Sequence, residues 1–328
     1  MWRCYSLDTS RCRPAGFDLF QVLAITAPIF IIIGFGFFAS RWGLVTREQI
    51  RGIGTFVVTF AMPALMIKAL SERPIAQVLD PGYLTAYAVA SLIAFGIGML
   101  VFRFYRKAEL QNRAIAAMGM SCSNSAFIGF PIAYMAAGPS AAVALALGML
   151  VENLLIIPLA LALAEAGLQK GGSIASVLLG TFKRLGKNPL IISIIVGLTL
   201  SVLNIRLPTA PLKVVEMLAQ ASAPAALFVI GGVLYGTKVR GQLNEIALIA
   251  SGKLVMHPLL VGLMFLLLGS VEPSMMLAGL VFASAPMMSV YPILGQRFGF
   301  EGRCAAALVI TTLTSFFTVS ILLMLIHP

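Results

Sequence analysis

The sequence predicts an all-α polytopic membrane protein in which ten transmembrane helices form two inverted repeats of five helices each. Three observations predict this fold class: the composition, a series of long apolar runs, and prolines that recur at one spacing. Of the 328 residues, 59% are hydrophobic and 11% are charged, whereas soluble domains are about 45–50% apolar and about 25% charged. So few charges cannot cover the surface of a soluble protein. The composition therefore excludes a soluble enzyme, a disordered protein and, despite the net charge of +11, a nucleic-acid-binding protein.

Long apolar runs supply the transmembrane helices. The hydrocarbon core of a bilayer is ~30 Å thick, and a helix needs about 20 apolar residues to cross it. Runs bounded by charged residues, prolines or glycines predict ten such helices, at 19–39, 49–69, 82–104, 113–137, 140–165, 188–204, 211–236, 243–269, 274–298 and 303–326.

The lysines and arginines predict the orientation. The connections that follow predicted helices 1, 3, 5, 7 and 9 carry 16 of the 23 Lys and Arg residues, and the opposite side, both tails included, carries the other 7. Cytoplasmic loops are rich in Lys and Arg. We therefore expect both termini to be periplasmic in a bacterial inner membrane, although Arg3, Arg11 and Arg13 in the N-terminal tail oppose this weakly.

The spacing of the prolines indicates an internal repeat. Three pairs of prolines are each 161 residues apart, and each pair falls in corresponding helices of the two halves: Pro28 and Pro189, Pro63 and Pro224, Pro131 and Pro292. Because five helices is an odd number, the second copy enters the membrane from the opposite side, as in the inverted repeats of many secondary transporters. We expect an N-terminal tail at 1–18, a first repeat at 19–165, a basic cytoplasmic linker at 166–187 and a second, inverted repeat at 188–328.

Two mid-span stretches, 121–131 and 283–292, combine small polar residues with prolines. Proline removes an amide donor and blocks a helical hydrogen bond, and the helix ends that result suit an anionic group. In inverted-repeat transporters the substrate lies at the midplane between such broken helices. A proline kink packed by neighbouring helices is the alternative. The candidate substrate-binding residues are Asn124, Ser125, Gly129, Pro131, Ser284, Pro286, Ser289 and Pro292.

Ionisable residues within membrane helices are costly and usually functional. Glu152, beside Asn153, falls near the middle of the fifth predicted helix and is a candidate to bind a proton or sodium ion, or to form a structural pair with a buried cation. Lys253 and His257 are one turn apart and share a helix face. Lys253 could offer a counter-charge to a substrate or to Glu152, or could extend to the cytoplasmic interface. His257 is a proton relay or a hydrogen-bonded spacer.

The sequence contains no arrangement typical of catalysis. There is no phosphate-binding loop, and the four cysteines and two histidines lack the spacing of metal ligands. We expect no enzyme activity, no metal and no cofactor. A Cys4–Cys12 disulfide remains an option if the N-terminus is periplasmic.

The sequence resembles the auxin efflux carrier family, in its bacterial branch of malonate-type transporters, over nearly all of the chain after residue 18. The order of several short motifs across the ten predicted helices carries this resemblance. They are Phe60–Leu65, Asn124–Pro131, Ala223–Phe228 with Gly231, Lys253–Leu254 with Pro258, Ala285–Met287, Gln296–Gly299 and Thr311–Ser315.

The resemblance implies a scaffold domain of helices 1, 2, 6 and 7 and a transport domain of helices 3–5 and 8–10. It implies that helices 4 and 9 cross at Pro131 and Pro292, with Asn124 as the polar residue of the first crossing helix. The repeat partner of Asn124 is Ala285, so polar contacts from helix 9 must come from Ser284, Ser289 or the backbone.

Together these features predict a secondary transporter of a small organic anion, a malonate- or auxin-like mono- or dicarboxylate, that works by alternating access. The alternative is a sodium-coupled organic anion symporter of the bile-acid type with the same fold. The expected partners are the anion, the lipid bilayer and either a proton or a sodium ion, and a homodimer is left open.

Overall fold

The computed structural model describes residues 2–3, 13–14, 19–72, 80–168, 186–235, 243–268 and 271–325. In these ranges the chain is helical, apart from one short antiparallel pairing of β1 (Trp2–Arg3) with β2 (Arg13–Pro14). Cys4, Cys12 and residues 169–185 of the predicted basic linker lie outside the described residues. Cys122 and Cys304 are buried free thiols.

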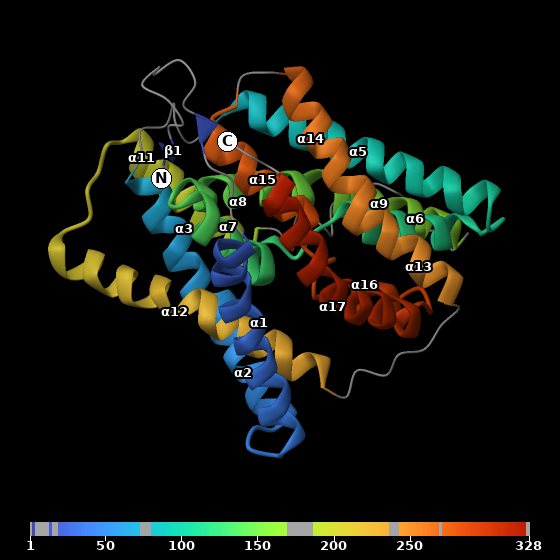
Figure 1. The fold of residues 1–328 in the computed structure, drawn as a ribbon, viewed down its shortest axis with the longest axis horizontal. Helices are drawn as coiled ribbons and strands as arrows, with labels where there is room; N and C mark the ends of the chain where they lie inside the picture. Colours follow the sequence, from blue (N-terminus) through green and yellow to red (C-terminus); the bar gives the residue numbers. More distant parts are fainter. Residues whose placement is uncertain are drawn as a thin grey trace.

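Figure 1 shows the helices in their order along the chain. In the described residues, three segments of the first half and one of the second contain a π-helical turn, denoted η, and two segments are interrupted. The first half consists of α1 (Leu19–Arg41), α2 (Arg47–Phe56), η2 (Val57–Ala61), α3 (Met62–Ser71), α5 (Pro81–Phe104), α6 (Leu110–Ser121), η3 (Ser125–Gly129), α7 (Phe130–Ala137), α8 (Ser140–Val151), η4 (Glu152–Ile156) and α9 (Ile157–Gly167). The second half consists of α11 (Pro189–Val202), α12 (Thr209–Leu234), α13 (Leu243–Ser251), η5 (Gly252–Met256), α14 (His257–Leu268), α15 (Pro273–Ser284), α16 (Tyr291–Gln296) and α17 (Glu301–Leu325).

Polar residues in the connections begin several of these helices. Thr46 and Gln49 form a reciprocal capping box at the start of α2, which satisfies two amide groups that the helix itself leaves unbonded. Asp80 accepts from the backbone amide of Tyr83 at the start of α5, and Asn188 accepts from that of Leu190 at the start of α11. In both cases a proline follows the cap at the first helical position, where its missing N–H has no helical partner to lose.

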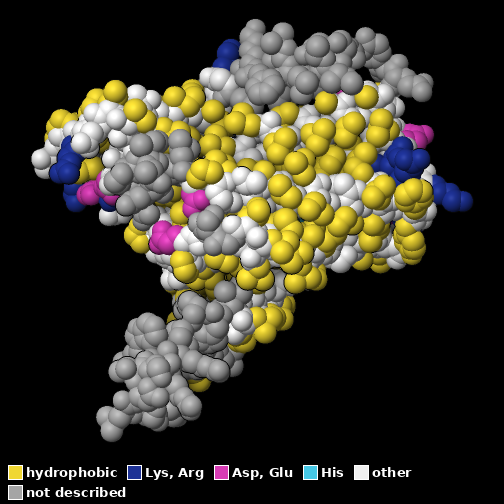
Figure 2. All heavy atoms as spheres, turned by 90° about the horizontal axis from the view of Figure 1, so that it is seen from above, with side chains coloured by type: hydrophobic (Ala, Val, Ile, Leu, Met, Phe, Trp, Pro, Cys, Tyr) yellow, Lys and Arg dark blue, Asp and Glu magenta, His cyan; other side chains and the backbone are white. Residues whose placement is uncertain are grey.

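Within the described residues, eight helical segments are long and apolar enough to cross a membrane. The predicted segments at 188–204 and 274–298 correspond to shorter apolar helices, Pro189–Val202 and Pro273–Ser284 respectively. Large apolar side chains are exposed on the outer faces, and Figure 2 shows hydrophobic side chains across most of one face, with charges mainly towards its ends. A surface of this kind suits lipid rather than water, so the chain is a multi-pass membrane protein.

The helices pack as two groups. In one, α1 lies against α12, and α3 lies against both α11 and α12. In the other, α5 lies against α6 and α14, α6 against α9, and α15 against α8. Glycines bring α1 and α12 into close contact, because a Cβ on Gly36 or Gly231 would collide with a backbone carbonyl oxygen of the facing helix. Gly34 and Gly96 have no such neighbour, so they are not needed for close packing here.

Candidate functional site

Two interrupted segments meet at the centre of the site. The chain leaves helical conformation at 122–124, between α6 and η3, and again at 285–290, between α15 and α16. The backbone amide of Asn124 donates to the carbonyl oxygen of Pro286 at 2.7 Å, and the side-chain amide of Asn124 donates to Ser289 Oγ at 2.7 Å. The structure therefore brings Asn124, Pro286 and Ser289 together, as the sequence predicts.

The two prolines hold different places relative to the interruptions. Pro292 is the second residue of α16, which directly follows the second interruption. Pro131 is the second residue of α7, but η3 leads into α7 without a break, so Pro131 lies inside the helical segment that resumes at Ser125. The hydrogen bonds that join the two segments run from Asn124 to Pro286 and Ser289, and a crossing at the two prolines stays a prediction.

π-Helical turns carry several of the polar residues around the crossing. Each of the four turns η2, η3, η4 and η5 begins six residues before a proline, and the prolines are Pro63, Pro131, Pro158 and Pro258. A proline cannot donate to the carbonyl four residues earlier, and a wider turn adjusts the backbone ahead of it. Such turns are frequent at functional sites. Three of them carry polar side chains of the site: Ser125 in η3, Glu152 in η4 and Lys253 in η5.

A buried charged cluster lies against the first interruption. Glu152 Oε1 accepts from the backbone amide of Ser123 at 3.0 Å, from Ser125 Oγ at 3.4 Å and from Tyr87 Oη at 3.5 Å. Lys253 Nζ donates to Ser123 Oγ at 2.7 Å and to the carbonyl oxygen of Ala283 at 2.6 Å. Ser123 therefore links the carboxylate and the ammonium group, and Lys253 touches both interrupted segments.

Lys253 does not extend to the membrane interface. Its side chain has no exposed surface, and its Nζ lies 2.9 Å from His257 Nδ1. The other ring nitrogen of His257 lies 3.1 Å from Ser91 Oγ. Because a buried charge is stable only when it is paired and hydrogen-bonded, these contacts explain how η5 holds Lys253 inside the protein. Of the two alternatives for His257, the hydrogen-bonded one describes its place here, between Lys253 and Ser91.

Other predicted site residues have local roles. Ser284 is buried and donates to the carbonyl oxygen of Leu280 in its own helix. The side-chain amide of Asn153 donates to the carbonyl oxygen of Met149, one turn earlier, and not to a residue of the cluster. Gly129 permits close packing, because a Cβ there would lie 2.9 Å from a ring carbon of Phe282 and 3.4 Å from Ala285 Cβ. None of these three contributes a polar side-chain contact to the crossing.

Sequence reasoning missed residues that the fold adds to the cluster. Ser123 lies in the polar stretch 121–131 but is not among the predicted site residues. The predicted site residues also do not include Tyr83, Tyr87 and Ser91 of α5. The signal that could have found the last three is their spacing of four residues in an apolar run, which places them on one face of α5.

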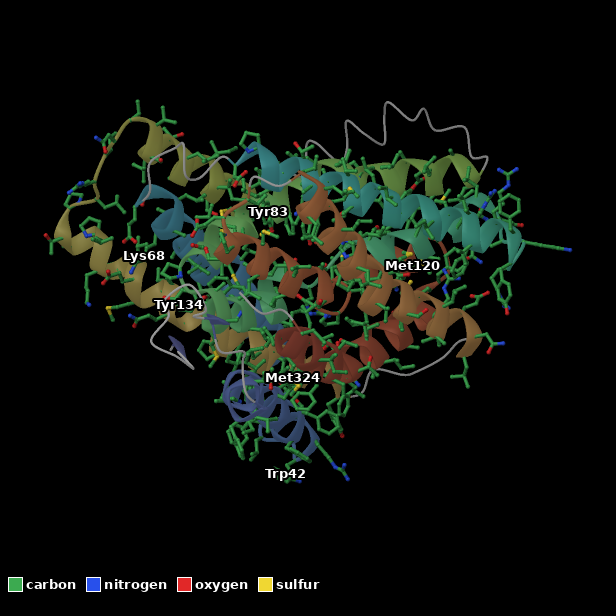
Figure 3. All side chains as sticks on the ribbon, turned by 45° about the horizontal axis from the view of Figure 1, so that its top comes forward. Trp42, Lys68, Tyr83, Met120, Tyr134 and Met324 are labelled. Carbon is green, nitrogen blue, oxygen red and sulfur yellow. The ribbon has the colours of Figure 1, made fainter. Side chains whose placement is uncertain are left out.

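A cavity of about 450 Å³ lies beside the crossing segments, between the two helix groups. Its wall includes Lys68 of α3, Tyr134 of α7 and Glu216 of α12, and Figure 3 shows Lys68 and Tyr134 close together at one side of the molecule. Lys68 Nζ lies 3.1 Å from Glu216, and Lys213 Nζ lies 3.4 Å from the same carboxylate. Phe130, in the first turn of α7, and Glu72 also line the cavity.

Nothing in the described part of the chain resembles a metal centre, since no three His, Cys, Asp or Glu side chains gather there. The arrangement instead offers hydrogen-bond donors at a crossing of broken helices, a buried acidic and a buried basic side chain beside it that Ser123 links, and a cavity at the boundary between two helix groups. These are features for binding and releasing a solute.

Comparison with known proteins gives the relatives of this chain. A family described as "Membrane transport protein" matches residues 22–323. The chain is 30% identical over 316 residues to a "Putative malonate transporter" of Rhizobium meliloti, a match that covers 94% of this chain and 96% of the relative. It is 22% identical to the "Uncharacterized transporter YfdV" of Escherichia coli, covering 78% of this chain and 86% of that protein. A mouse "Lysosomal cholesterol signaling protein" is 24% identical over 75% of this chain, which spans 30% of that protein.

Proposed function

The chain belongs to the family of membrane transport proteins, the auxin efflux carriers, and from that premise we propose that it is a secondary transporter of a small organic anion. The substrate class is a malonate- or auxin-like mono- or dicarboxylate, moved by alternating access across a bacterial inner membrane with both termini in the periplasm. The name of the Rhizobium relative supports the substrate class, and the charge bias of the loops supports the orientation.

The crossing of the two interrupted segments is the observation that carries the proposal. The turn η3 begins there, and the first amide groups of a helix have no partner within it and attract negative charge. At the end of α15 the opposite, carbonyl end is compensated, because Lys253 Nζ donates to Ala283 O. A carboxylate at the crossing therefore meets the amide donors of this helix start and the side-chain amide of Asn124, while the nearby carbonyl end is already compensated.

The cavity supports a route to this crossing. Its volume of about 450 Å³ falls within the range of ~300–1,000 Å³ typical of small-molecule sites. It runs beside α7, the helix that follows the first interruption, and two lysines share the one carboxylate of Glu216 at its edge. We assign it as the approach for the anion from the side on which α3 ends and α12 begins.

The two helix groups support alternating access. The cavity lies where α3 and α12 of one group face α7 and α8 of the other, so a shift of one group against the other would open and close it. The proposal includes ten membrane helices in two inverted repeats, with α11 and α15–α16 as the shorter members. The matching second-position placement of Pro131 and Pro292, 161 residues apart, supports that repeat.

Proton coupling is favoured over sodium coupling by the position of Lys253. A sodium ion binds oxygen ligands, and two oxygens of this cluster, Ser123 Oγ and Ala283 O, are already held by the Lys253 ammonium group. Glu152 is then the group that exchanges a proton. Efflux of an anion from a negative interior needs no coupling ion, since the membrane potential supplies ~2.3 kcal/mol per charge per 100 mV. Coupling therefore matters for uptake.

The test is transport of labelled malonate and indole-acetate by protein in proteoliposomes, under imposed proton, sodium and voltage gradients. We expect saturable transport that responds to the proton gradient and not to sodium. Asn124→Ala should abolish it in a folded protein, whereas Asn244→Ala, an exposed residue in the first turn of α13, should not change it.

Three results would contradict parts of the proposal separately. Transport that survives Asn124→Ala removes the substrate from the crossing. Uptake driven by sodium favours the bile-acid type of symporter. No transport of any carboxylate contradicts the anion as substrate and leaves the family assignment intact.

A further inference from the structure

The hydroxyl group of Tyr83 is buried without a partner. Tyr83 has no exposed surface, and its Oη makes no hydrogen bond in the structure. A buried hydroxyl without a hydrogen bond costs ~1–3 kcal/mol, and polar groups of this kind in native proteins are commonly satisfied by an ordered water. This side chain therefore requires an explanation that its apolar neighbours do not give.

The surroundings of Tyr83 leave a place for one small molecule. A Cβ added to Gly148 of α8 would lie 3.8 Å from Tyr83 Oη and 3.8–3.9 Å from Cε1 and Cζ of Tyr87. These are ordinary contact distances, so the absent side chain leaves room of about methyl size beside both phenol groups. The two rings are stacked, with centroids 5.7 Å apart, and Phe265 covers the other side of Tyr83.

A row of hydroxyl side chains along the inner face of α5 leads into the charged cluster. This hydroxyl row consists of Tyr83, Tyr87 and Ser91. Tyr87 Oη donates to Glu152 Oε1, and Ser91 contacts His257. Tyr83 is the third residue of α5, and the half-buried Asp80 caps the start of that helix. Figure 3 shows Tyr83 near the beginning of α5. The hydroxyl row thus runs from the start of α5 to its middle.

We propose that the space beside Gly148 binds a water molecule that joins Tyr83 to Tyr87, and that this water completes a proton path to Glu152. The inference rests on the proposed proton coupling and adds the route. A proton arriving at Tyr83 is passed to the water, the water passes one to Tyr87, and Tyr87 passes its hydroxyl proton to the Glu152 carboxylate. Each relay group gains one proton as it gives one, so the only net change is that the carboxylate becomes a carboxylic acid.

The groups around Glu152 are consistent with this direction of transfer. Tyr87 faces it from α5, Cys122 and Ser123 from the first interruption, Ser125 from η3 and Lys253 from η5. His257 of α14 lies behind Lys253. Tyr87 is the member of this set whose helix face continues with a further hydroxyl, that of Tyr83 one turn earlier in α5.

The test compares three variants with the wild-type protein, all in full-length form in proteoliposomes. Tyr83→Phe removes the hydroxyl and keeps the ring, and Gly148→Ala fills the proposed water site without a collision. Gly96→Ala is the matched control, because a Cβ on this glycine of α5 meets nothing within 4 Å.

The first measurement is infrared spectroscopy after a pH jump, which follows the carbonyl stretch of protonated Glu152, assigned with Glu152→Gln. We expect it to appear at least ~10-fold more slowly in Tyr83→Phe and Gly148→Ala than in the wild type and in Gly96→Ala, since each loses one link of the relay. Equal rates in all four proteins would overturn the path. This readout needs no substrate, so it still tests the path if malonate is not transported.

The second measurement is exchange of labelled malonate for unlabelled malonate, which involves no net proton movement. Exchange should stay close to the wild-type rate in both variants while uptake driven by a proton gradient falls. An equal loss of exchange and of gradient-driven uptake would mean that Tyr83 and Gly148 have only a structural role, and would overturn the proposal. Absence of exchange in the wild-type protein would instead contradict the proposed substrate.

Discussion

The two interrupted segments share a backbone plan and differ in their chemistry. Both are interrupted in mid-segment, and each has a proline at the second position of an α-helix beyond the break, in α7 after the turn η3 and in α16 directly after the break. The first break supplies donors, the backbone and side-chain amides of Asn124, and is anchored by Glu152 through the amide of Ser123. The second supplies acceptors, the carbonyls of Ala283 and Pro286 and the hydroxyl of Ser289. The two breaks are therefore complementary, because one presents hydrogen-bond donors and the other presents acceptors.

The largest expected effect comes from replacing Lys253, the residue that contacts both interrupted segments. Lys253→Met should lower the free energy of unfolding by ~3–5 kcal/mol, because Glu152 loses a buried cationic partner. Transport should be lost as well. Thermal unfolding in detergent measures the change, with Lys213→Met, whose side chain is largely exposed, as the control.

The double variant Lys253→Met/Glu152→Gln separates the two consequences. It should recover most of the stability, since no unpaired charge remains, and it should not recover proton-coupled transport. A Lys253→Met protein as stable as the wild type would show that the charge pair does not join the two breaks.

Asn124→Ala tests the donor side of the comparison. The variant keeps its backbone bond to Pro286 but loses the side-chain amide that points to Ser289. Removal of a hydrogen bond to a charged ligand is worth ~1.5–3 kcal/mol, so the Kd for the carboxylate substrate should rise about 10- to 100-fold. Calorimetric titration with malonate measures it. An unchanged Kd would mean that the first break does not bind the anion.

Ser289→Ala tests the acceptor side and should be milder. The Pro286 carbonyl still receives the Asn124 amide, and Ser289 is only half-buried, so water can replace its hydroxyl. We expect a loss of stability of ~0.5–1 kcal/mol and only a several-fold change in the Kd measured by the same titration. If Ser289→Ala equals or exceeds Asn124→Ala, the chemistry is shared by both breaks.

The paired prolines should give the smallest effects. Pro131 follows a π-helical turn that carries Ser125, whereas no such turn precedes Pro292. Pro131→Ala supplies an amide that lets the turn relax and moves Ser125 away from Glu152. We expect it to change transport a few-fold and Pro292→Ala to change it less, both with stability changes below ~1 kcal/mol. The order would be reversed if the second break were the more constrained one.

Much of the fold and part of the site could be predicted from local sequence. The long apolar runs predicted the helices, and Pro131 and Pro292 with their small polar neighbours predicted that two of the segments are broken. Asn124 and Ser289 were named because small polar residues stood beside those prolines. Each of these conclusions depends on residues within about one helical turn, which is the range over which backbone hydrogen bonding and proline sterics act.

Only the tertiary structure decided which distant groups meet. Ser91 contacts His257 across 166 residues, and Lys253 contacts Ser123 across 130. The sequence left open whether Lys253 turns inward or extends to the interface, and it did not indicate that Gly148 lies beside the phenol groups of Tyr83 and Tyr87. Such contacts depend on how each helix is rotated and shifted against its neighbours, and that is fixed by many packed side chains together. The sequence by itself determined the membrane helices and their breaks. The packing determined the charged cluster, the cavity and the hydroxyl row of α5.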